Sequence, residues 1–121
     1  MTQKILIVDD EPDIVKVLAA RLKERGYDVT VAAGGQEGLM KAGRQSPDLI
    51  ILDIMMPDMD GSEVAARLKQ IPATAKIPII FLSALQTKKE EKEGSAMISG
   101  NVVMAKPYDI DVLCAKIREM I

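Results

Sequence analysis

The sequence predicts an α/β fold in which a five-stranded parallel sheet carries helices on both faces. Five short apolar segments alternate along the chain with five segments of helical pattern, which is typical of a parallel sheet. Three of the apolar segments are continuously hydrophobic, as expected for strands that are covered on both faces. With 121 residues and 48% hydrophobic residues, the chain is long enough to form one domain with its own core.

The expected strands are the five apolar segments Lys4–Val8, Tyr27–Ala32, Leu49–Leu52, Ile79–Leu82 and Val102–Ala105. The first, third and fourth are apolar throughout. The second alternates between polar and apolar residues, which indicates an edge strand with one solvated face. The fifth is short and fits the opposite edge. These features match the strand order 2-1-3-4-5 that doubly wound sheets adopt.

The clearest expected helices cover about Pro12–Arg25, about Gly35–Gln45, the segment after Asp60 and the segment after Asp109. Pro12 suits a first helical turn, and Gly26 suits the position just after a helix. The pair Asp60 and Glu63 resembles a capping box, and Asp109 is a good N-cap residue. Helical spacing predicts one apolar stripe on the first helix, at Ile14, Val17, Leu18 and Leu22. It predicts another on the last helix, at Leu113, Ile117, Met120 and Ile121.

The fourth helix, about Thr87–Gly94, differs from the others because it has almost no apolar stripe. One interpretation is an ordinary helix with a solvated face. The other is a loosely docked helix that can respond to a switch. The sequence leaves both open.

Composition excludes several classes of function. The net charge of −2 and the sequence pI of about 5.2 argue against a nucleic-acid-binding face. No apolar run approaches the roughly 18 residues of a membrane span, and no secretory signal is evident. The chain has no histidine, which removes histidine ligands, histidine bases and any role as a phosphohistidine donor. Its single cysteine, Cys114, fits a core position in a protein of the reducing cytoplasm.

Charged residues stand where three of the apolar segments end. Asp9 and Asp10 follow the first strand, Asp53 follows the third and Lys106 follows the fifth. The carboxyl ends of parallel strands meet at one edge of the sheet, so these side chains should converge there. Three neighbouring carboxylates repel one another. A hard divalent cation such as Mg²⁺ would compensate, and Mg²⁺ usually acts beside phosphate. The pattern therefore predicts phosphoryl chemistry on a carboxylate.

Together with these residues, the loop motifs resemble the receiver domains of two-component response regulators, of the chemotaxis-regulator-like kind. The resemblance covers essentially all of residues 1–121 as a single receiver domain with no output domain. It also implies the flavodoxin-like strand order given above. The motifs that carry it are Val8–Pro12, Leu52–Gly61, Ser83-Ala84 and Lys106-Pro107-Tyr108.

The resemblance implies that Asp53 is the phosphoacceptor and forms an acyl phosphate. The phosphoryl group would come from a partner histidine kinase or histidine phosphotransfer protein, because this chain has no histidine. Mg²⁺, with Mn²⁺ as a substitute, would be bound by Asp10, Asp53 and the backbone carbonyl of Met55. Asp9 would contact the metal mostly through water. Lys106 and Ser83 would contact the phosphoryl oxygens.

Val103 departs from the family pattern. It stands three residues before Lys106, where the family usually has an aromatic side chain that moves together with the hydroxyl group. Ser83 and Val103 therefore mark a switch region in which loop and helix movement, rather than an aromatic residue, would carry the output. Tyr108 follows Lys106 and does not replace the missing ring.

Met55 and Leu85 lie two residues after Asp53 and Ser83, respectively. By resemblance, these positions flank the path of the water that hydrolyses the phosphorylated aspartate. Both side chains are apolar and cannot orient water. We therefore expect slow self-dephosphorylation, with simple loop packing as the alternative.

The expected function is a phosphorylation-dependent switch that controls a downstream protein or a fused output domain, and not a turnover enzyme. Three alternative functions fit the sequence less well. A flavin or nucleotide domain needs a glycine-rich or hydroxyl-rich loop after the first strand, where this chain has Asp9-Asp10-Glu11. Phosphatases that form an aspartyl-phosphate intermediate typically have a second aspartate two residues after the nucleophile. This chain has Met55 at that position, which argues against a phosphatase. A receiver that signals without phosphorylation would not need Asp53 and Lys106.

Overall fold

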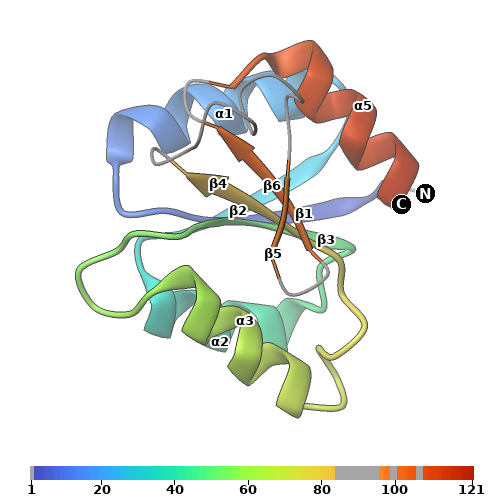
Figure 1. The fold of residues 1–121 in the computed structure, drawn as a ribbon. Coiled ribbons are helices and arrows are strands. Elements are labelled where there is room, and N and C mark those ends of the chain that lie inside the picture. Colours follow the sequence, from blue (N-terminus) through green and yellow to red (C-terminus); the bar gives the residue numbers. More distant parts are fainter. Residues whose placement is uncertain (1, 84–95, 99–100, 106–107) are drawn as a thin grey trace.

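The computed structural model describes residues 2–83, 96–98, 101–105 and 108–121. Helices flank the sheet on both sides, with α1 and α5 on one face and α2 and α3 on the other (Figure 1). The strands are β1 (Lys4–Val8), β2 (Asp28–Ala32), β3 (Leu49–Asp53), β4 (Ile79–Ser83), β5 (Ala96–Ile98) and β6 (Asn101–Ala105). The helices are α1 (Pro12–Glu24), α2 (Gly35–Gln45), α3 (Gly61–Gln70) and α5 (Ile110–Met120).

The sheet has the order β2-β1-β3-β4-β6-β5. Its five parallel strands, β2, β1, β3, β4 and β6, confirm the predicted order 2-1-3-4-5. The expectation that the fifth parallel strand is an edge is wrong, because β5 pairs with β6 in the antiparallel direction and lies outside it. A strand of three residues is too short to show a hydrophobic period, so no local pattern predicts β5.

Alternation along the strands divides the core into two layers. Successive side chains of a strand point to opposite faces, so Ile5 and Ile7 contribute to the cluster under α1 and α5. Leu6 and Val8 contribute to the cluster under α2 and α3. Each of the first four residues of β3 is completely buried, because both faces are covered. Cys114 of α5 is also fully buried, which confirms its predicted core position.

The stripe predicted for the first helix is wrong at Val17, and Ile14 is only half-buried. Val17 is 51% exposed, whereas Val15 is buried. The buried residues of α1, spaced at three and four positions as a helical face requires, are Val15, Leu18, Ala19 and Leu22. The residues predicted to mark the start and the end of this helix do so. Pro12 occupies the first turn, and Gly26 follows the helix with φ of 95°, a left-handed conformation that favours glycine.

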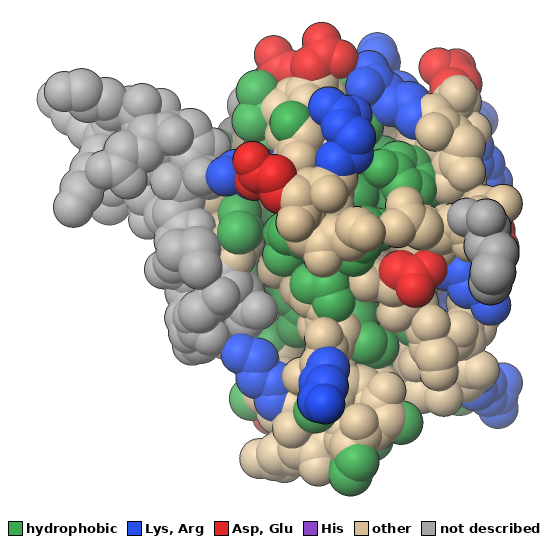
Figure 2. Space-filling model, turned by 90° about the vertical axis from the view of Figure 1, so that its right-hand side faces the viewer, with side chains coloured by type: hydrophobic (Ala, Val, Ile, Leu, Met, Phe, Trp, Pro, Cys, Tyr) green, Lys and Arg blue, Asp and Glu red, His purple; other side chains and the backbone are tan. Residues whose placement is uncertain are grey.

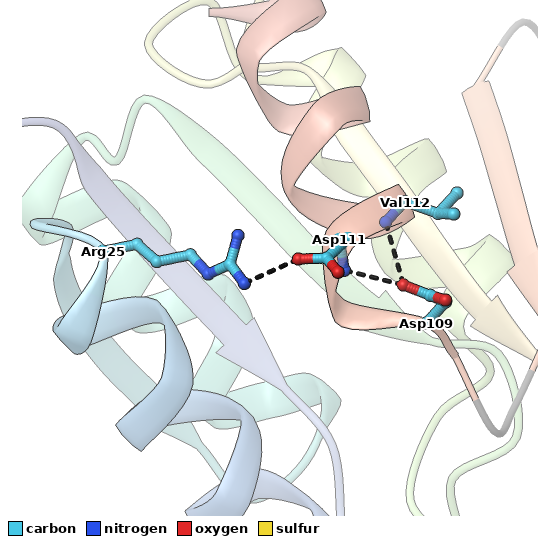
Figure 3. Close-up of polar contacts among 4 residues, drawn as sticks. All are labelled: Arg25, Asp109, Asp111 and Val112. Atoms are coloured by element: carbon cyan, nitrogen blue, oxygen red, sulfur yellow. Dashed lines mark hydrogen bonds and ion pairs between the residues drawn. The ribbon is translucent and has the colours of Figure 1, made fainter.

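Of the two predicted caps, one is confirmed. The Asp109 carboxylate accepts hydrogen bonds from the N–H groups of Asp111 (2.8 Å) and Val112 (3.2 Å) at the start of α5 (Figure 3). The capping box at Asp60 is wrong, because the Asp60 side chain makes no capping hydrogen bond. The carboxylate of Glu63 instead pairs with Arg67 one turn further along α3, at 3.2 Å, so it does not reach back to the cap.

An ion pair between Arg25 and Asp111 joins the end of α1 to the start of α5, with 2.8 Å between the nitrogen and the oxygen (Figure 3). Both side chains are well exposed, so water and salt screen the pair and it adds little to stability. The helix expected at Thr87–Gly94 lies outside the described residues.

Candidate functional site

Three aspartates converge at the carboxyl edge of the sheet, as the sequence predicts. Asp9 and Asp10 follow β1, and Asp53 is the last residue of the neighbouring strand β3. One carboxylate oxygen from each lies within 4.8 Å of the others. Asp9 is 3% exposed and Asp53 is 4% exposed, whereas Asp10 is half-buried. Two of the three carboxylates are therefore largely shielded from water, and Asp10 is the most accessible of them.

This donor set fits a hard divalent cation. Three carboxylates at this spacing repel one another, and burial strengthens the repulsion because little water screens it. The Glu11 N–H donates a hydrogen bond of 3.0 Å to Asp9, which offsets part of the negative charge. Carboxylate oxygens are the ligands that Mg²⁺ and Ca²⁺ prefer. A hollow of about 250 Å³ borders Asp9 and Asp10, so solvent reaches the cluster on the side of these two residues.

Ser83 lies at the same edge of the sheet, whereas Val103 does not. Ser83 is the last residue of β4 and is 5% exposed, and its strand partner is Ala105 at the end of β6. Val103 is 7% exposed and belongs to the core cluster under α2 and α3. Lys106 follows directly after β6, but both Lys106 and Leu85 lie outside the described residues. The structure thus brings Ser83 close to the carboxylate edge and leaves Val103 as a core residue.

The loop that follows Asp53, residues 54–60, is held at its two ends by backbone hydrogen bonds. The Ile54 N–H donates to the carbonyl of Leu82 at 3.1 Å. The Gly61 N–H donates to the carbonyl of Ile54 at 2.7 Å, which closes the loop onto the start of α3. Met55 is 59% exposed and does not pack in the core. Its position beside the carboxylates is compatible with a role through the backbone.

Asp58 makes a contact that sequence reasoning missed. Its two carboxylate oxygens accept hydrogen bonds from the first N–H groups of α2, those of Gly35 (3.1 Å) and Gln36 (3.2 Å). These bonds, the one from Gly35 first, lower the pKa of Asp58 below its ordinary value of 3.8. Residues 34 and 35 are both glycine, so α2 has no capping side chain of its own. A helix that begins without a cap is the only sequence signal for this contact.

The Asp58 contact predicts a specific acid sensitivity. Because the pKa of Asp58 is lower in the folded protein than in the unfolded chain, the ionised carboxylate stabilises the fold. That stabilisation is fully present above pH 3.8 and is lost as the pH falls through the folded-state pKa. Urea unfolding from about pH 5 to about pH 2 should therefore be less pH-dependent for Asp58→Asn than for the wild type. Asp60→Asn, a nearby exposed control, should follow the wild type, and parallel profiles for all three proteins would contradict the prediction.

A larger hollow lies away from the carboxylates. It has a volume of about 620 Å³ and lies between α1 and the start of α5, where Ile14, Val17, Tyr108 and Ile110 contribute apolar surface. The chemistry predicted from the sequence is therefore not located in this larger hollow.

The surface agrees with the weakly negative composition. On the face drawn in Figure 2, the described Lys and Arg side chains are spread around the perimeter and interspersed with Asp and Glu. Over the described part of that face they form no continuous basic surface. In the described ranges, none of the helices has the length and apolar character needed to cross a bilayer.

Comparisons with known proteins point to one family. Residues 5–118 match the family described as the response regulator receiver domain. The chain is 37% identical over 120 residues to the response regulator PleD of Caulobacter vibrioides, covering 99% of this chain and 26% of PleD. It is also 37% identical over 121 residues to the alkaline phosphatase synthesis transcriptional regulatory protein PhoP of Bacillus subtilis, covering all of this chain and 49% of PhoP. The chain thus spans between a quarter and a half of these relatives.

Solved structures agree. The receiver domain of the Francisella response regulator 1452 superposes with a TM-score of 0.84 at 32% identity, over 98% of this chain and 96% of that one. The chemotaxis protein CheY4 of Vibrio cholerae superposes with a TM-score of 0.86 at 28% identity, over the full length of both chains.

Proposed function

The chain belongs to the response regulator receiver domain family, and we propose that it is a phosphorylation-dependent signalling switch with Asp53 as its phosphoacceptor. The observation that carries this proposal is the position of Asp53. Its carboxylate is buried at the end of β3, with oxygens of Asp9 and Asp10 within 4.8 Å. A carboxylate at that edge can react with a phosphoryl group that arrives at the carboxyl ends of the strands.

The donor is a phosphohistidine on a histidine kinase or histidine phosphotransfer protein. An Asp53 carboxylate oxygen forms the new bond to phosphorus while the bond from phosphorus to the donor's imidazole nitrogen breaks. The phosphoryl group ends on Asp53 as an acyl phosphate, and the histidine is released in its unphosphorylated form. Because the transition state of such a transfer is loose, catalysis consists mainly of positioning and of offsetting charge.

Mg²⁺ is the proposed cofactor, with Mn²⁺ as a substitute. Asp10, Asp53 and the Met55 backbone carbonyl would hold it directly, and Asp9 mostly through water. When bound, Mg²⁺ offsets the charge of the carboxylates and of the phosphoryl oxygens. Lys106 supplies a further positive charge. The three carboxylates and this lysine together carry a charge of −2, which the divalent cation would neutralise. Ser83, at the end of β4, donates its hydroxyl to a phosphoryl oxygen.

Phosphorylation changes the surface through Ser83 and the loops at this edge, and a downstream protein or a fused output domain reads that change. Val103 replaces the family's aromatic residue and packs in the core. It is too short to swing between a buried and an exposed position, so loop and helix movement, rather than an aromatic side chain, carries the response. PhoP of Bacillus subtilis is named a transcriptional regulatory protein. We likewise propose a comparable transcriptional output and a cytoplasmic location for this chain.

Intact-mass measurement tests the proposed function directly. The protein is incubated with acetyl phosphate, a small phosphodonor, with and without Mg²⁺, alongside Asp53→Asn. We expect one added phosphoryl group that requires both Mg²⁺ and Asp53. An equal mass increase in Asp53→Asn would show that another residue is the acceptor. No mass increase in any sample, with Mg²⁺ still raising the unfolding temperature, would indicate a metal-binding receiver that signals without phosphorylation.

The apolar residues beside the site predict a long-lived phosphorylated state. Met55 is 59% exposed and offers no group that can orient water, and Leu85 has the same chemical character. The double variant Met55→Asn with Leu85→Glu should hydrolyse its phosphoaspartate faster by about tenfold, which is about 1.4 kcal/mol of barrier. Loss of the added mass over time measures the rate. Met40→Asn is the matched control because Met40 is also about half exposed, at 51%, but lies on α2. An unchanged rate in the double variant would refute the tuning role.

A further inference from the structure

We propose that Asp58 is a positioning residue that fixes the loop after Asp53 in the arrangement that binds a divalent cation. The inference rests on the proposed function, because it concerns the metal site of the same reaction. Asp58 does not touch the carboxylate cluster in the described structure. It acts through the backbone of residues 54–60, which connects the end of β3 to α3 and carries Met55.

The first argument is how the loop is attached. Its ends are held by the Ile54 and Gly61 backbone hydrogen bonds of 3.1 and 2.7 Å described above. Between these ends, the Asp58 carboxylate bonds to the N–H groups of Gly35 and Gln36, on a different element. Met56 and Met59 are both 7% exposed, so they anchor the inner side of the loop by packing. Asp58 supplies the polar anchor on the outer side.

The second argument is that the anchor is rigid on the α2 side. A Cβ placed on Gly34 would lie 3.0 Å from an Asp58 oxygen, and one placed on Gly35 would lie 2.8 Å from the Met59 Cβ. The helix and the loop are therefore in contact along both residues, with glycine making the close approach feasible. A loop in such close contact cannot shift by a few tenths of an ångström without losing hydrogen bonds or packing.

The third argument concerns what α2 is attached to. At Gly38, one turn further along α2, an added Cβ would lie 2.8 Å from a Val8 methyl carbon. Val8 is the last residue of β1 and directly precedes Asp9. Contacts thus run from the strand that supplies Asp9 and Asp10, through α2, to Asp58 and the loop. Asp58 therefore links the loop after Asp53, through α2, to the strand that precedes Asp9 and Asp10.

A cation site makes this connection useful. A backbone carbonyl such as that of Met55 has no side-chain rotamer to adjust, so its position depends entirely on the loop. Groups that orient metal ligands without touching the metal typically change metal affinity by about 10- to 100-fold when they are removed. Coupling is also reciprocal, so a contact that favours cation binding must itself be strengthened when the cation binds.

Mg²⁺ binding measured by titration calorimetry provides the first test. Asp58→Ala should raise the Mg²⁺ dissociation constant on the order of tenfold, and Asp58→Asn, which keeps one acceptor oxygen, should recover part of the loss. Asp60→Ala is the matched control, because it removes the same charge from the same loop where the side chain makes no capping bond. With acetyl phosphate, the Mg²⁺ concentration that half-saturates phosphorylation should rise in Asp58→Ala. The rate at saturating Mg²⁺ should stay within about twofold of the wild type, because positioning acts on metal affinity and not on the nucleophile.

The second test needs no variant. Mg²⁺ should slow amide hydrogen exchange at Gly35 and Gln36 of the wild-type protein, because the Asp58 contact and cation binding stabilise one another. This measurement remains decisive if Asp58→Ala does not fold. Equal dissociation constants for Asp58→Ala and Asp60→Ala, or unchanged exchange at Gly35 and Gln36 in a wild type that binds Mg²⁺, would overturn the inference alone. A wild type that neither binds Mg²⁺ nor becomes phosphorylated would overturn the proposed function, and the inference with it.

Discussion

Replacing Gly61 with alanine is expected to destabilise the fold by about 3 kcal/mol, at the upper end of typical overpacking costs. Gly61 is the first residue of α3 and is buried. A Cβ at this position would press against the backbone carbonyl oxygen of Asp53 and would lie 2.9 Å from the Cα of Ile54. Backbone atoms cannot rotate away as a flexible side chain can, so the start of α3 would have to move. The same movement would weaken the Gly61-to-Ile54 hydrogen bond of 2.7 Å.

Gly43 provides the matched control, since it lies within α2 and has nothing within 4 Å of an added Cβ. Gly43→Ala should stabilise the protein by about 0.5–1 kcal/mol, because alanine loses less backbone freedom when a helix forms. Urea unfolding of the two variants measures both effects, and opposite signs are expected. If Gly61→Ala were as stable as the wild type, the close approach of α3 to the end of β3 would be wrong. Phosphorylation of Gly61→Ala should also be slow, because Asp53 shares the displaced backbone.

The second large effect is on metal-linked stability. At a Mg²⁺ concentration about a hundredfold above the dissociation constant, the free energy of unfolding should rise by about 2.7 kcal/mol. Asp53→Asn should have two effects of opposite direction. The metal-free variant should be more stable than the metal-free wild type, because one of three repelling carboxylates is gone. Its gain on addition of Mg²⁺ should be much smaller, because Asp53 is a proposed direct ligand.

Urea titrations with and without Mg²⁺ provide both values. Asp9→Asn should behave in the same direction with a smaller loss of the Mg²⁺ gain, because Asp9 is proposed to contact the metal mostly through water. Glu24→Gln removes the same charge from the last residue of α1 and should keep the full gain. A Mg²⁺ gain that survives in Asp53→Asn would place the cation elsewhere on the protein.

Elements of the fold could be predicted where local sequence determines them, and could not where contacts with residues distant in the sequence determine them. The continuously apolar strands, such as Leu49–Leu52, could be recognised because both of their faces are buried, and such burial produces an unbroken apolar run in the local sequence. The face of α1 was harder, since Val15 and Val17 are chemically alike and only contact with the sheet decides which is buried. The antiparallel strand β5 depends on pairing with β6 and has no local pattern of its own.

The candidate site shows the same division. Asp9, Asp10 and Asp53 could be assigned to one edge because each follows a recognisable strand, and the rule for parallel sheets then brings them together. Asp58 could not be assigned, because its partners at Gly35 and Gln36 are more than twenty residues away in the sequence. The predicted capping box at Asp60 is wrong for a related reason. The Glu63 carboxylate could bond either to the N–H groups at the helix start or to Arg67, and the sequence does not show which interaction forms.

Modification of Cys114 by a thiol reagent can measure how often α5 separates from the sheet. This residue is the single cysteine of the chain and is completely shielded between α5 and the sheet. A thiol reagent can therefore modify the folded protein only after α5 has separated from the sheet, and each molecule can be modified once. The labelling rate then measures how often the α5 face opens. A comparison of the labelling rate with and without phosphorylation would show whether the proposed modification of Asp53 loosens or tightens the packing of α5 on the sheet.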